Sequence, residues 1–256
     1  YLTLRFYLQI IIKRKSFLLL SLKGGYVLLQ LHYNEFFQSL RNCVMTNYQD
    51  YRREYEANGL RRADLKSDPF AQFADWLNDA EVACPLDATS MTLATADVDG
   101  RPTARMVLLK SFDKQGMVWY SDNRSEKGQQ LVQNPQAALL FYWQTLERQV
   151  RITGKVEVLS EDIIEAYFHS RPRGSQISAA ISPQSQIVAN RAELEQSVAD
   201  LESQMTDKPI PRPASWIGYC LQPDSFEFWQ GRPSRLHDRF RYQLLDNGWH
   251  IDRLAP

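Results

Sequence analysis

Cysteine and histidine are scarce in this chain of 256 residues. The three cysteines, Cys43, Cys84 and Cys220, form no CxxC pair, and the four histidines show no HExxH spacing. An odd number of scattered thiols argues against a disulfide framework or a zinc site. We therefore expect no metal site, and we expect a cytoplasmic location, where thiols stay reduced.

Net charge and glycine-rich loops are absent as well. Thirty lysines and arginines balance thirty aspartates and glutamates, so no overall field attracts nucleic acid or an anionic membrane. Neither GxGxxG nor GxxxxGK[ST] occurs, which excludes the common phosphate-binding loops. If the protein binds phosphates, side chains and helix ends must hold them.

The sequence also lacks an uninterrupted hydrophobic run of about 20 residues, the length that a membrane helix needs. Residues 1–44 come closest, but basic residues such as Arg5 and Lys23 interrupt them, and no acidic residue precedes Glu35. A transit peptide would also be basic and poor in acids. We expect this stretch to be translated upstream sequence outside the fold, with Met45 as the native start, and we expect no membrane partner.

From residue 67 onward, helical patterns alternate with strand-like runs. Phe70, Phe73 and Leu77 have the spacing of a buried helical stripe, and Asp68 can cap that helix. Runs rich in β-branched and aromatic residues, separated by turn residues, predict antiparallel strands. This succession predicts a mainly β (α+β) barrel with peripheral helices. Helices are expected at 67–83, 125–134, 160–170 and 190–205, and strands at 90–96, 103–112, 117–121, 137–143, 148–159, 215–222, 226–230 and 235–245, with 247–254 closing a hairpin.

Two of these strands carry cations that could bind an anion. In RLHDRF, an extended strand would place Arg235, His237 and Arg239 on one face, although a solvated edge strand also uses such charges. In RMVLLK, Arg105 and Lys110 fall on opposite faces unless a bulge or the strand end intervenes. A buried strand with charged ends is the alternative for RMVLLK.

Two helix ends could grip a phosphate. In YFHSRPRGS, Tyr167 and Arg171 are four residues apart and share a helix face, and Ser175 follows beyond a proline. The alternative is a helix end with a favourable C-terminal arginine. In SEKGQQL, Ser125 can cap a short helix whose free N–H groups favour an anion, and Lys127 adds charge.

In their order along the chain, these stretches resemble the pyridoxine 5′-phosphate oxidase family. The matching segments are YRREYEANGL, RMVLLK, TLERQVRITGKVE, YFHSRPRGSQI, FEFWQGRPSRLHDRF and WHIDRLAP, within residues 48–256. The resemblance implies a homodimer of split β-barrels with FMN at the subunit interface. It also implies oxidation of pyridoxine or pyridoxamine 5′-phosphate to pyridoxal 5′-phosphate. Oxygen would be the acceptor, yielding hydrogen peroxide, and the amine substrate would also release ammonia. Residues 67–256 would form the oxidase domain, and residues 45–66 would cover its site.

The resemblance also assigns residues to the site. The positions matching FMN contacts are Arg105, Met106, Val107, Leu108, Leu109, Lys110, Tyr120, Ser121, Lys127, Gln149, Gln184, Ser185, Trp229 and Arg239. The positions matching substrate contacts are Lys110, Tyr167, Arg171 and Ser175 at the phosphate, Arg235 and His237 at the ring, and Arg52 and Tyr55 in a covering segment. Arg235 and His237 are the expected catalytic pair. A hydride equivalent would leave the substrate's C4′ carbon for the flavin, which requires near-contact geometry.

One position departs from the family pattern. The family usually has arginine where this chain has Glu126, so a cation near the FMN phosphate is replaced by an anion. At about 4 Å, two unit charges interact by about 1 kcal/mol in water and about 4 kcal/mol at an effective dielectric constant of 20. We predict that FMN affinity is lowered unless Glu126 turns to solvent or Arg124 substitutes, and that Glu126→Arg tightens binding.

Two other functional classes compete with the oxidase. A split-barrel protein that carries or senses flavin or haem would keep the fold without needing the substrate grip. The full set of substrate-matching residues favours the enzyme. Nucleic-acid binding is disfavoured because the chain is neutral and shows no recognised module.

Overall fold

The computed structural model describes residues 18–22, 25–29 and 48–256. The chain divides into two compact units, residues 1–53 and residues 54–256. In the first unit, strands β1 (Leu18–Leu22) and β2 (Gly25–Leu29) pair as an antiparallel hairpin. The prediction that residues 1–44 stand outside the fold falls largely on positions outside the described residues.

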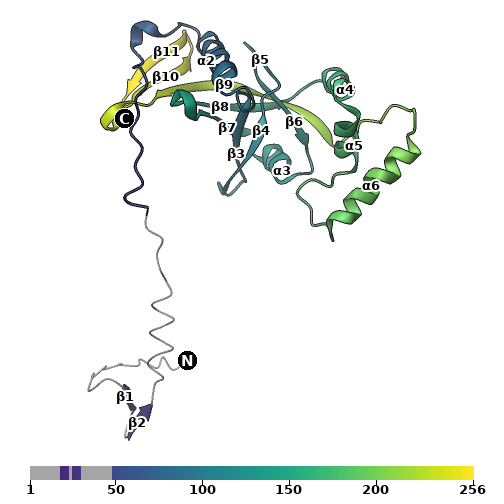
Figure 1. The fold of residues 1–256 in the computed structure, drawn as a ribbon, viewed down its shortest axis with the longest axis horizontal. Coiled ribbons are helices and arrows are strands. Elements are labelled where there is room, and N and C mark those ends of the chain that lie inside the picture. The colour runs from purple at the N-terminus through teal and green to yellow at the C-terminus, as the bar shows by residue number, and fades with distance from the viewer. Residues whose placement is uncertain (1–17, 23–24, 30–47) are drawn as a thin grey trace. The chain divides into compact units, whose positions relative to one another are not determined.

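An antiparallel sheet of nine strands dominates residues 54–256 (Figure 1). Its hydrogen-bonded order is β11-β10-β9-β8-β7-β3-β4, and β6 pairs with both β5 and β9. Alternation of buried and less buried side chains along β3 and β7 explains why these segments are strands with one face in the core. The strands are β3 (Ser90–Ala96), β4 (Pro102–Leu108), β5 (Ser111–Asp113), β6 (Gly116–Asp122), β7 (Gln136–Trp143), β8 (Arg148–Val158), β9 (Trp216–Gln230), β10 (Asp238–Leu245) and β11 (Gly248–Leu254).

Strand β9 is the longest strand of this sheet and organises the rest of it. Its first half pairs with β6 and its second half with β10, while β8 follows it along the other side. The register shifts between Thr153 and Gly154 of β8. A Cβ atom at Gly154 would lie 2.0 Å from the carbonyl oxygen of Gln222, so only glycine fits this close approach.

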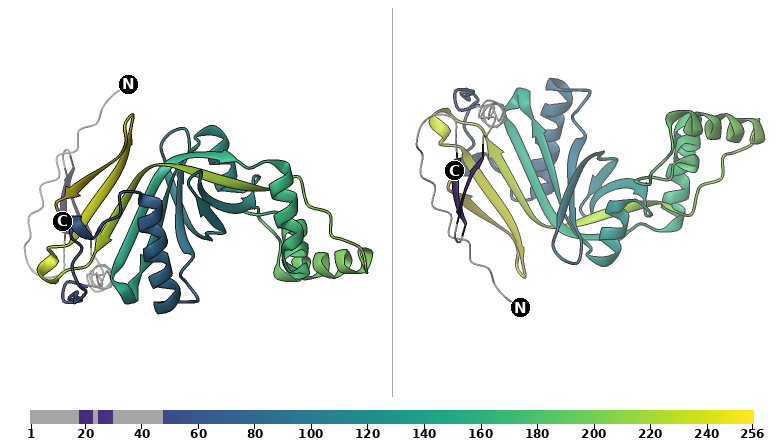
Figure 2. Two further views of the ribbon diagram at one scale, coloured as in Figure 1. Left: turned by 90° about the horizontal axis from the view of Figure 1, so that it is seen from above. Right: turned by 90° about the horizontal axis from the view of Figure 1, so that it is seen from below.

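Helix α2 (Pro69–Ala83) covers one face of the sheet (Figure 2). Asp68 caps it by accepting a hydrogen bond from the Phe70 N–H at 3.0 Å. The Phe73 ring, fully buried, meets Phe112 and Phe141 edge-on, with centroids 5.0 Å away in each case. Burial of these large aromatic side chains against the sheet is the main stabilising contribution of this layer.

Four further helices lie at the ends of strands, where they border the candidate site. Ser125 caps α3 (Glu126–Gln133), as predicted, by accepting from the Gly128 N–H. Helices α4 (Glu161–Ser170) and α5 (Arg173–Ile181) lie beside the start of β9, and α6 (Arg191–Gln204) follows them (Figure 1). Three short 3-10 helices are η1 (Arg62–Asp64), η2 (Gln144–Leu146) and η3 (Pro233–Arg235). Among the described residues, no helix is long and apolar enough to cross a membrane.

The predicted mainly β fold with peripheral helices is confirmed, but several boundaries differ. The run 103–112 is divided between β4 and β5, because the chain leaves the strand at Leu109 and Lys110. The runs 215–222 and 226–230 are one strand, β9. Helix α5 was not predicted, although Pro172 serves as its N-cap residue.

The prediction that RLHDRF is one continuous strand is wrong. Arg235 belongs to η3 and has a left-handed backbone with φ of +63°, as does Ser234 with +56°. Strand β10 begins only at Asp238. The alternation that placed Arg235, His237 and Arg239 on one strand face therefore does not apply, because two of the three precede the strand.

Candidate functional site

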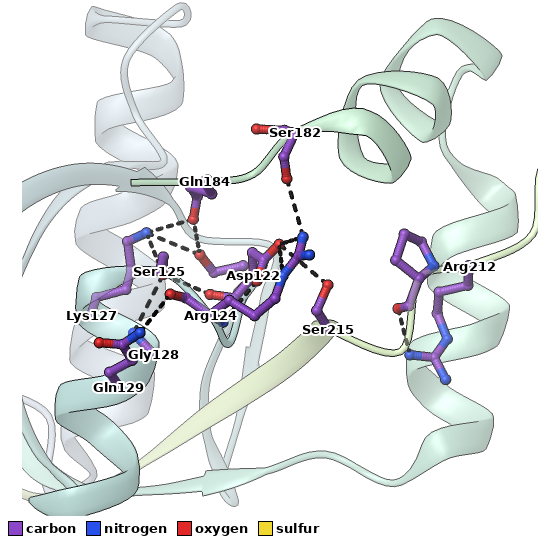
Figure 3. Close-up of polar contacts among 12 residues, drawn as sticks. Asp122, Arg124, Ser125, Lys127, Gly128, Gln129, Ser182, Gln184, Arg212 and Ser215 are labelled. Atoms are coloured by element: carbon purple, nitrogen blue, oxygen red, sulfur yellow. Dashed lines mark hydrogen bonds and ion pairs between the residues drawn. The ribbon is translucent and has the colours of Figure 1, made fainter. Parts of the chain in front are cut away.

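A buried lysine marks one end of the candidate site. The Lys127 side chain, 8% exposed, donates to Gln184 Oε1 at 2.8 Å, Ser121 Oγ at 3.1 Å and Ser125 Oγ at 3.2 Å (Figure 3). Burial, followed by the charge of Arg105, lowers the pKa of Lys127 to about 8. Within residues 48–256, no carboxylate lies within ion-pair distance of its ammonium group. A buried ammonium held only by neutral oxygens calls for an anion from outside the chain.

Arg105 lies close to this lysine on β4. Its side chain lies on the less exposed face of β4 and donates to Thr95 Oγ1 at 2.7 Å and to Thr103 Oγ1 at 2.5 Å. Burial lowers the pKa of Arg105, while an ion pair with Glu126 Oε2 at 3.5 Å acts in the opposite direction. We call Arg105, Ser121, Ser125, Lys127 and Gln184 the cation cluster.

An ion pair fixes the segment that carries Gln184. The buried Asp122 carboxylate accepts from the Arg124 backbone at 2.7 Å and from its guanidinium at 2.6 Å (Figure 3). Burial raises the pKa of Asp122, but these hydrogen bonds lower it more, so the pKa lies below its usual value. Arg124 also donates to the carbonyl oxygen of Ser182 at 3.2 Å, so it ties α3 to the chain entering Gln184.

A wall of stacked aromatic rings adjoins the cation cluster. The Tyr120 ring stacks on Tyr167, 4.0 Å away, and on Trp216, 5.1 Å away, and the latter two rings are themselves 6.2 Å apart. The Arg171 guanidinium lies 4.8 Å from the Trp216 ring centroid, a cation–π contact. Its Nη1 atom is buried and has no hydrogen-bond partner among the described residues. A Cβ atom at Gly218 would lie 2.7 Å from the Tyr120 ring, so this glycine makes room for the stack.

These groups share one cavity of about 310 Å³. Ser121 and Gln184 belong both to its lining and to the cation cluster, so the cluster opens into it. The cavity therefore presents cations and hydroxyl groups beside an aromatic wall, the combination that binds a flat ring with a phosphate. Its lining residues are Tyr120, Ser121, Asp122, Arg171, Ser178, Ala179, Ser182, Gln184 and Trp216.

A second group of candidate residues lies at the far end of β9. The rings of Trp229 and His237 are 4.6 Å apart, and Tyr55 meets both edge-on at 5.5 and 5.2 Å. His237 Nδ1 accepts from the Arg232 backbone N–H at 3.1 Å, so a neutral ring carries its proton on Nε2. Burial, followed by the charges of neighbouring arginines, lowers the pKa of His237. We call Tyr55, Trp229, Arg235, His237 and Arg239 the C-terminal group.

Arg239 is firmly held within this group. Its guanidinium donates to the buried Glu227 carboxylate at 2.8 Å and to the carbonyl oxygen of Ala255 at 2.7 Å. Glu227 also pairs with Arg151 across the strands. Arg235, in contrast, is exposed, and its left-handed conformation costs about 1 kcal/mol or more for a residue that has a Cβ atom.

The length of β9 separates the two groups. Trp216 borders the aromatic wall and Trp229 belongs to the C-terminal group, thirteen positions later on the same strand. At 3.3 Å per residue the separation is about 40 Å. Figures 1 and 2 show β9 running from β10 at one end to α4 and α5 at the other. Within one chain, the two groups cannot contact the same reacting atoms.

Comparison with known proteins identifies the family. The family model "Pyridoxamine 5′-phosphate oxidase" matches residues 77–205, and "Pyridoxine 5′-phosphate oxidase C-terminal dimerisation region" matches residues 216–256. A pyridoxine/pyridoxamine 5′-phosphate oxidase of Hydrogenovibrio crunogenus is 51% identical over 82% of this chain and 98% of its own length. That of Acaryochloris marina is 47% identical over 85% of this chain and all of its own.

The chain belongs to the pyridoxine/pyridoxamine 5′-phosphate oxidase family. The structure of PhzG from Burkholderia lata, in complex with tetrahydrophenazine-1-carboxylic acid, superposes with a TM-score of 0.73. It is 30% identical and covers 78% of this chain and 99% of its own. An FMN-binding protein of Nostoc punctiforme, 18% identical over 75% of this chain and 100% of its own, shares the fold with a TM-score of 0.60. The predicted oxidase family, enzyme class and split-barrel fold are confirmed.

Within this oxidase fold, the predicted site residues fall into three sets. The cavity end brings together Arg105, Tyr120, Ser121, Lys127, Tyr167, Arg171 and Gln184. The C-terminal end brings together Tyr55, Trp229, Arg235, His237 and Arg239, with Gln149 opposite Trp229 in the β8–β9 register. Among the described residues, the side chains of the remaining positions make no hydrogen bond to either group, and their roles stay predictions: Met106, Val107, Leu108, Leu109, Lys110, Ser175 and Ser185. Arg52 belongs to the first unit, and its role also stays a prediction.

Several features that build the site escaped the sequence argument. Arg124 was considered only as a substitute cation, whereas it pairs with Asp122 and donates to Ser182, nearly sixty residues away. Trp216 begins a strand, and nothing in its neighbourhood reveals the stack with Tyr120. The signal that could have found the first pair is the Asp-x-Arg-Ser run just before a capped helix, because it concentrates charge at a helix N-terminus.

Proposed function

We propose that this protein is an FMN-dependent oxidase that converts pyridoxine or pyridoxamine 5′-phosphate to pyridoxal 5′-phosphate. Oxygen is the acceptor, hydrogen peroxide is the by-product, and the amine substrate also yields ammonia. The observation that carries the proposal is the buried Lys127 ammonium, which has no carboxylate within ion-pair distance in residues 48–256. Its hydrogen-bond acceptors Ser121 and Gln184 line the cavity of about 310 Å³. Family membership supplies the reaction class.

The cation cluster fits the phosphate of FMN. Lys127 and Arg105 provide two cations, and Ser121 and Gln184 provide hydrogen-bonding groups on the same side of the cavity. Charge-assisted bonds of this kind are about twice as strong as bonds between neutral groups. When bound, FMN accepts the hydride equivalent that leaves the substrate.

Arg171 fits a second phosphate, that of the substrate. Its Nη1 atom is buried without a partner among the described residues, and its cation–π contact with Trp216 orients the guanidinium. Tyr167 lies on the same wall, and Ser175 and Lys110 complete the proposed grip. A phosphate held away from the reacting carbon supplies binding energy that aligns the ring.

We propose that the C-terminal group completes the site of a second copy of the chain. The two groups are about 40 Å apart on one strand, and the family match to residues 216–256 is described as a dimerisation region. A two-fold axis would place each C-terminal group against the partner's cavity and so form two equal sites.

In that arrangement, each residue of the C-terminal group has a separate task. His237, with Nδ1 occupied by Arg232, can donate from Nε2–H to a substituent of the substrate ring. Arg235 covers the exposed face of the ring and excludes water, and Arg239 and Trp229 contact the flavin. Tyr55 already packs on Trp229 and His237, which supports a covering role for its segment.

The reaction itself can be tested directly. The purified chain is supplied with FMN and then with pyridoxine 5′-phosphate under air, and pyridoxal 5′-phosphate is followed by its visible absorbance. Product formation at a rate that requires FMN is the expected result. Stoichiometric flavin binding without product would refute the oxidase and leave a flavin-binding protein. We also propose a cytoplasmic location, consistent with the free thiols of Cys84 and Cys220.

A further inference from the structure

Glu126 is an anion placed inside a cluster that is otherwise built to attract anions. Its Oε2 atom lies 3.5 Å from Arg105 Nη2, and Arg105 is held by Thr95 and Thr103 in a fixed position. The Glu126 side chain is 59% exposed, so it can rotate away, whereas the Arg105 side chain is only 19% exposed.

Among the described residues, Arg105 is the cation that forms an ion pair with this carboxylate. Arg124 is neutralised by Asp122 at 2.6 Å and directs its remaining contact to Ser182. Lys127 donates its hydrogen bonds to neutral oxygens, and Glu126 acts on it only as a nearby charge that raises its pKa against the larger effect of burial. Any phosphate that binds Arg105 must therefore share that guanidinium with Glu126 or displace it.

We propose that Glu126 is a specificity-determining residue that competes with the cofactor's phosphate for Arg105. It lowers the affinity for the phosphorylated flavin and leaves the affinity for the flavin ring unchanged. The inference rests on the proposed function, because it places the phosphate of FMN at the cation cluster. The quantity that Glu126 sets is the ratio of the dissociation constants for FMN and riboflavin, which differ only by the phosphate.

The test compares Glu126→Gln and Glu126→Arg with the unchanged chain. Flavin dissociation constants for FMN and riboflavin are measured by quenching of flavin fluorescence. Glu126→Gln is expected to tighten FMN binding about fivefold, since the carboxylate is more than half exposed and solvent weakens its interaction. Glu126→Arg should tighten it further, and riboflavin binding should change by less than about twofold in both variants.

A matched control separates this effect from a change in helix stability. Glu126 lies in the first turn of α3, and the exposed Asp162 lies in the first turn of α4. Asp162→Asn removes the same charge from the first turn of another helix. It should leave both flavin constants unchanged. The proposal would be overturned if Glu126→Gln tightened the binding of FMN and of riboflavin equally, or tightened the binding of neither.

Inorganic phosphate tests the competition without flavin. Thermal unfolding is recorded with increasing phosphate, because a ligand that binds the folded state raises the melting temperature. A larger rise for Glu126→Gln than for the unchanged chain supports the competition, and equal rises overturn it. If no form of the protein binds FMN, the proposed function fails, and the phosphate titration still decides the role of Glu126.

Discussion

A site shared between two copies of the chain predicts that two inactive variants restore each other. Arg171→Gln damages the cavity end, and Arg235→Ala damages the C-terminal group. In the proposed site each guanidinium would make a charged hydrogen bond or ring contact with the substrate worth about 1.5–3 kcal/mol, so each homodimer should lose about 10- to 100-fold in kcat/KM. Both variants should still bind FMN, because neither change alters the cation cluster.

The activity that a heterodimer of these two variants should regain can be calculated from the geometry. The two groups are about 40 Å apart in one chain, so each site takes one group from each copy. A heterodimer of the two variants then contains one site with both substitutions and one with neither. Purified through two different affinity tags, it should show about half of the unchanged activity, and a random mixture should show about a quarter.

The control pairs two changes at the same end of the site. Arg171→Gln combined with Tyr167→Ala, which changes the same aromatic wall, leaves one substitution in each site of the heterodimer, so activity should not recover. The assay is oxidation of pyridoxine 5′-phosphate at saturating FMN, with flavin content measured for every preparation. If the heterodimer of Arg171→Gln and Arg235→Ala is no more active than the mean of its parents, the shared site is refuted.

The other predictions concern single residues. Lys127→Met should weaken FMN binding about 10- to 100-fold by fluorescence titration. It should also stabilise the flavin-free protein at pH 7 by about 1–3 kcal/mol, because a buried ammonium with a pKa of about 8 opposes folding below that pH. This gain should shrink as pH rises from 8 towards 10.4, where the unfolded chain loses its proton; the exposed Lys114→Met is the control in thermal unfolding. His237→Asn keeps an acceptor for Arg232 and should retain FMN while kcat falls about 10- to 100-fold. Since the pKa of His237 is lowered, the acid limb of the pH–rate profile should have its midpoint below 6.5 and disappear in this variant.

Local patterns predicted those features that depend only on neighbouring residues. The alternation in RMVLLK correctly placed Arg105 and Val107 on one face of the strand, because a strand has a fixed period of two. Ser125 was correctly assigned as a cap, since its hydroxyl needs only the N–H groups of its own helix. Tyr167 and Arg171 do lie close together, but the predicted shared helix face is wrong, because Arg171 has already left the helix with ψ of 151°.

Contacts between distant segments decide the features that the local patterns did not predict. The RLHDRF stretch alternates like a strand, but Pro233 starts a 3-10 turn before it. Asp238 is then held by the N–H of Leu60, 178 residues away in the sequence. This contact fixes where β10 begins, and no periodicity in the neighbouring sequence records it.

The order of residues along the chain also conceals which of them can act together. Trp216 and Trp229 lie on one strand, which suggests a single site, yet a strand is the most extended conformation and holds them about 40 Å apart. In a symmetric pair of chains this extended conformation becomes useful. Strand β9 then holds Trp216 at the cavity of its own chain and Trp229 at the cavity of the partner. The register of β9 with β6 and β10 thus sets both halves of the site at once. A change that shortens or bends this strand should disturb two sites together, even where it touches neither ligand.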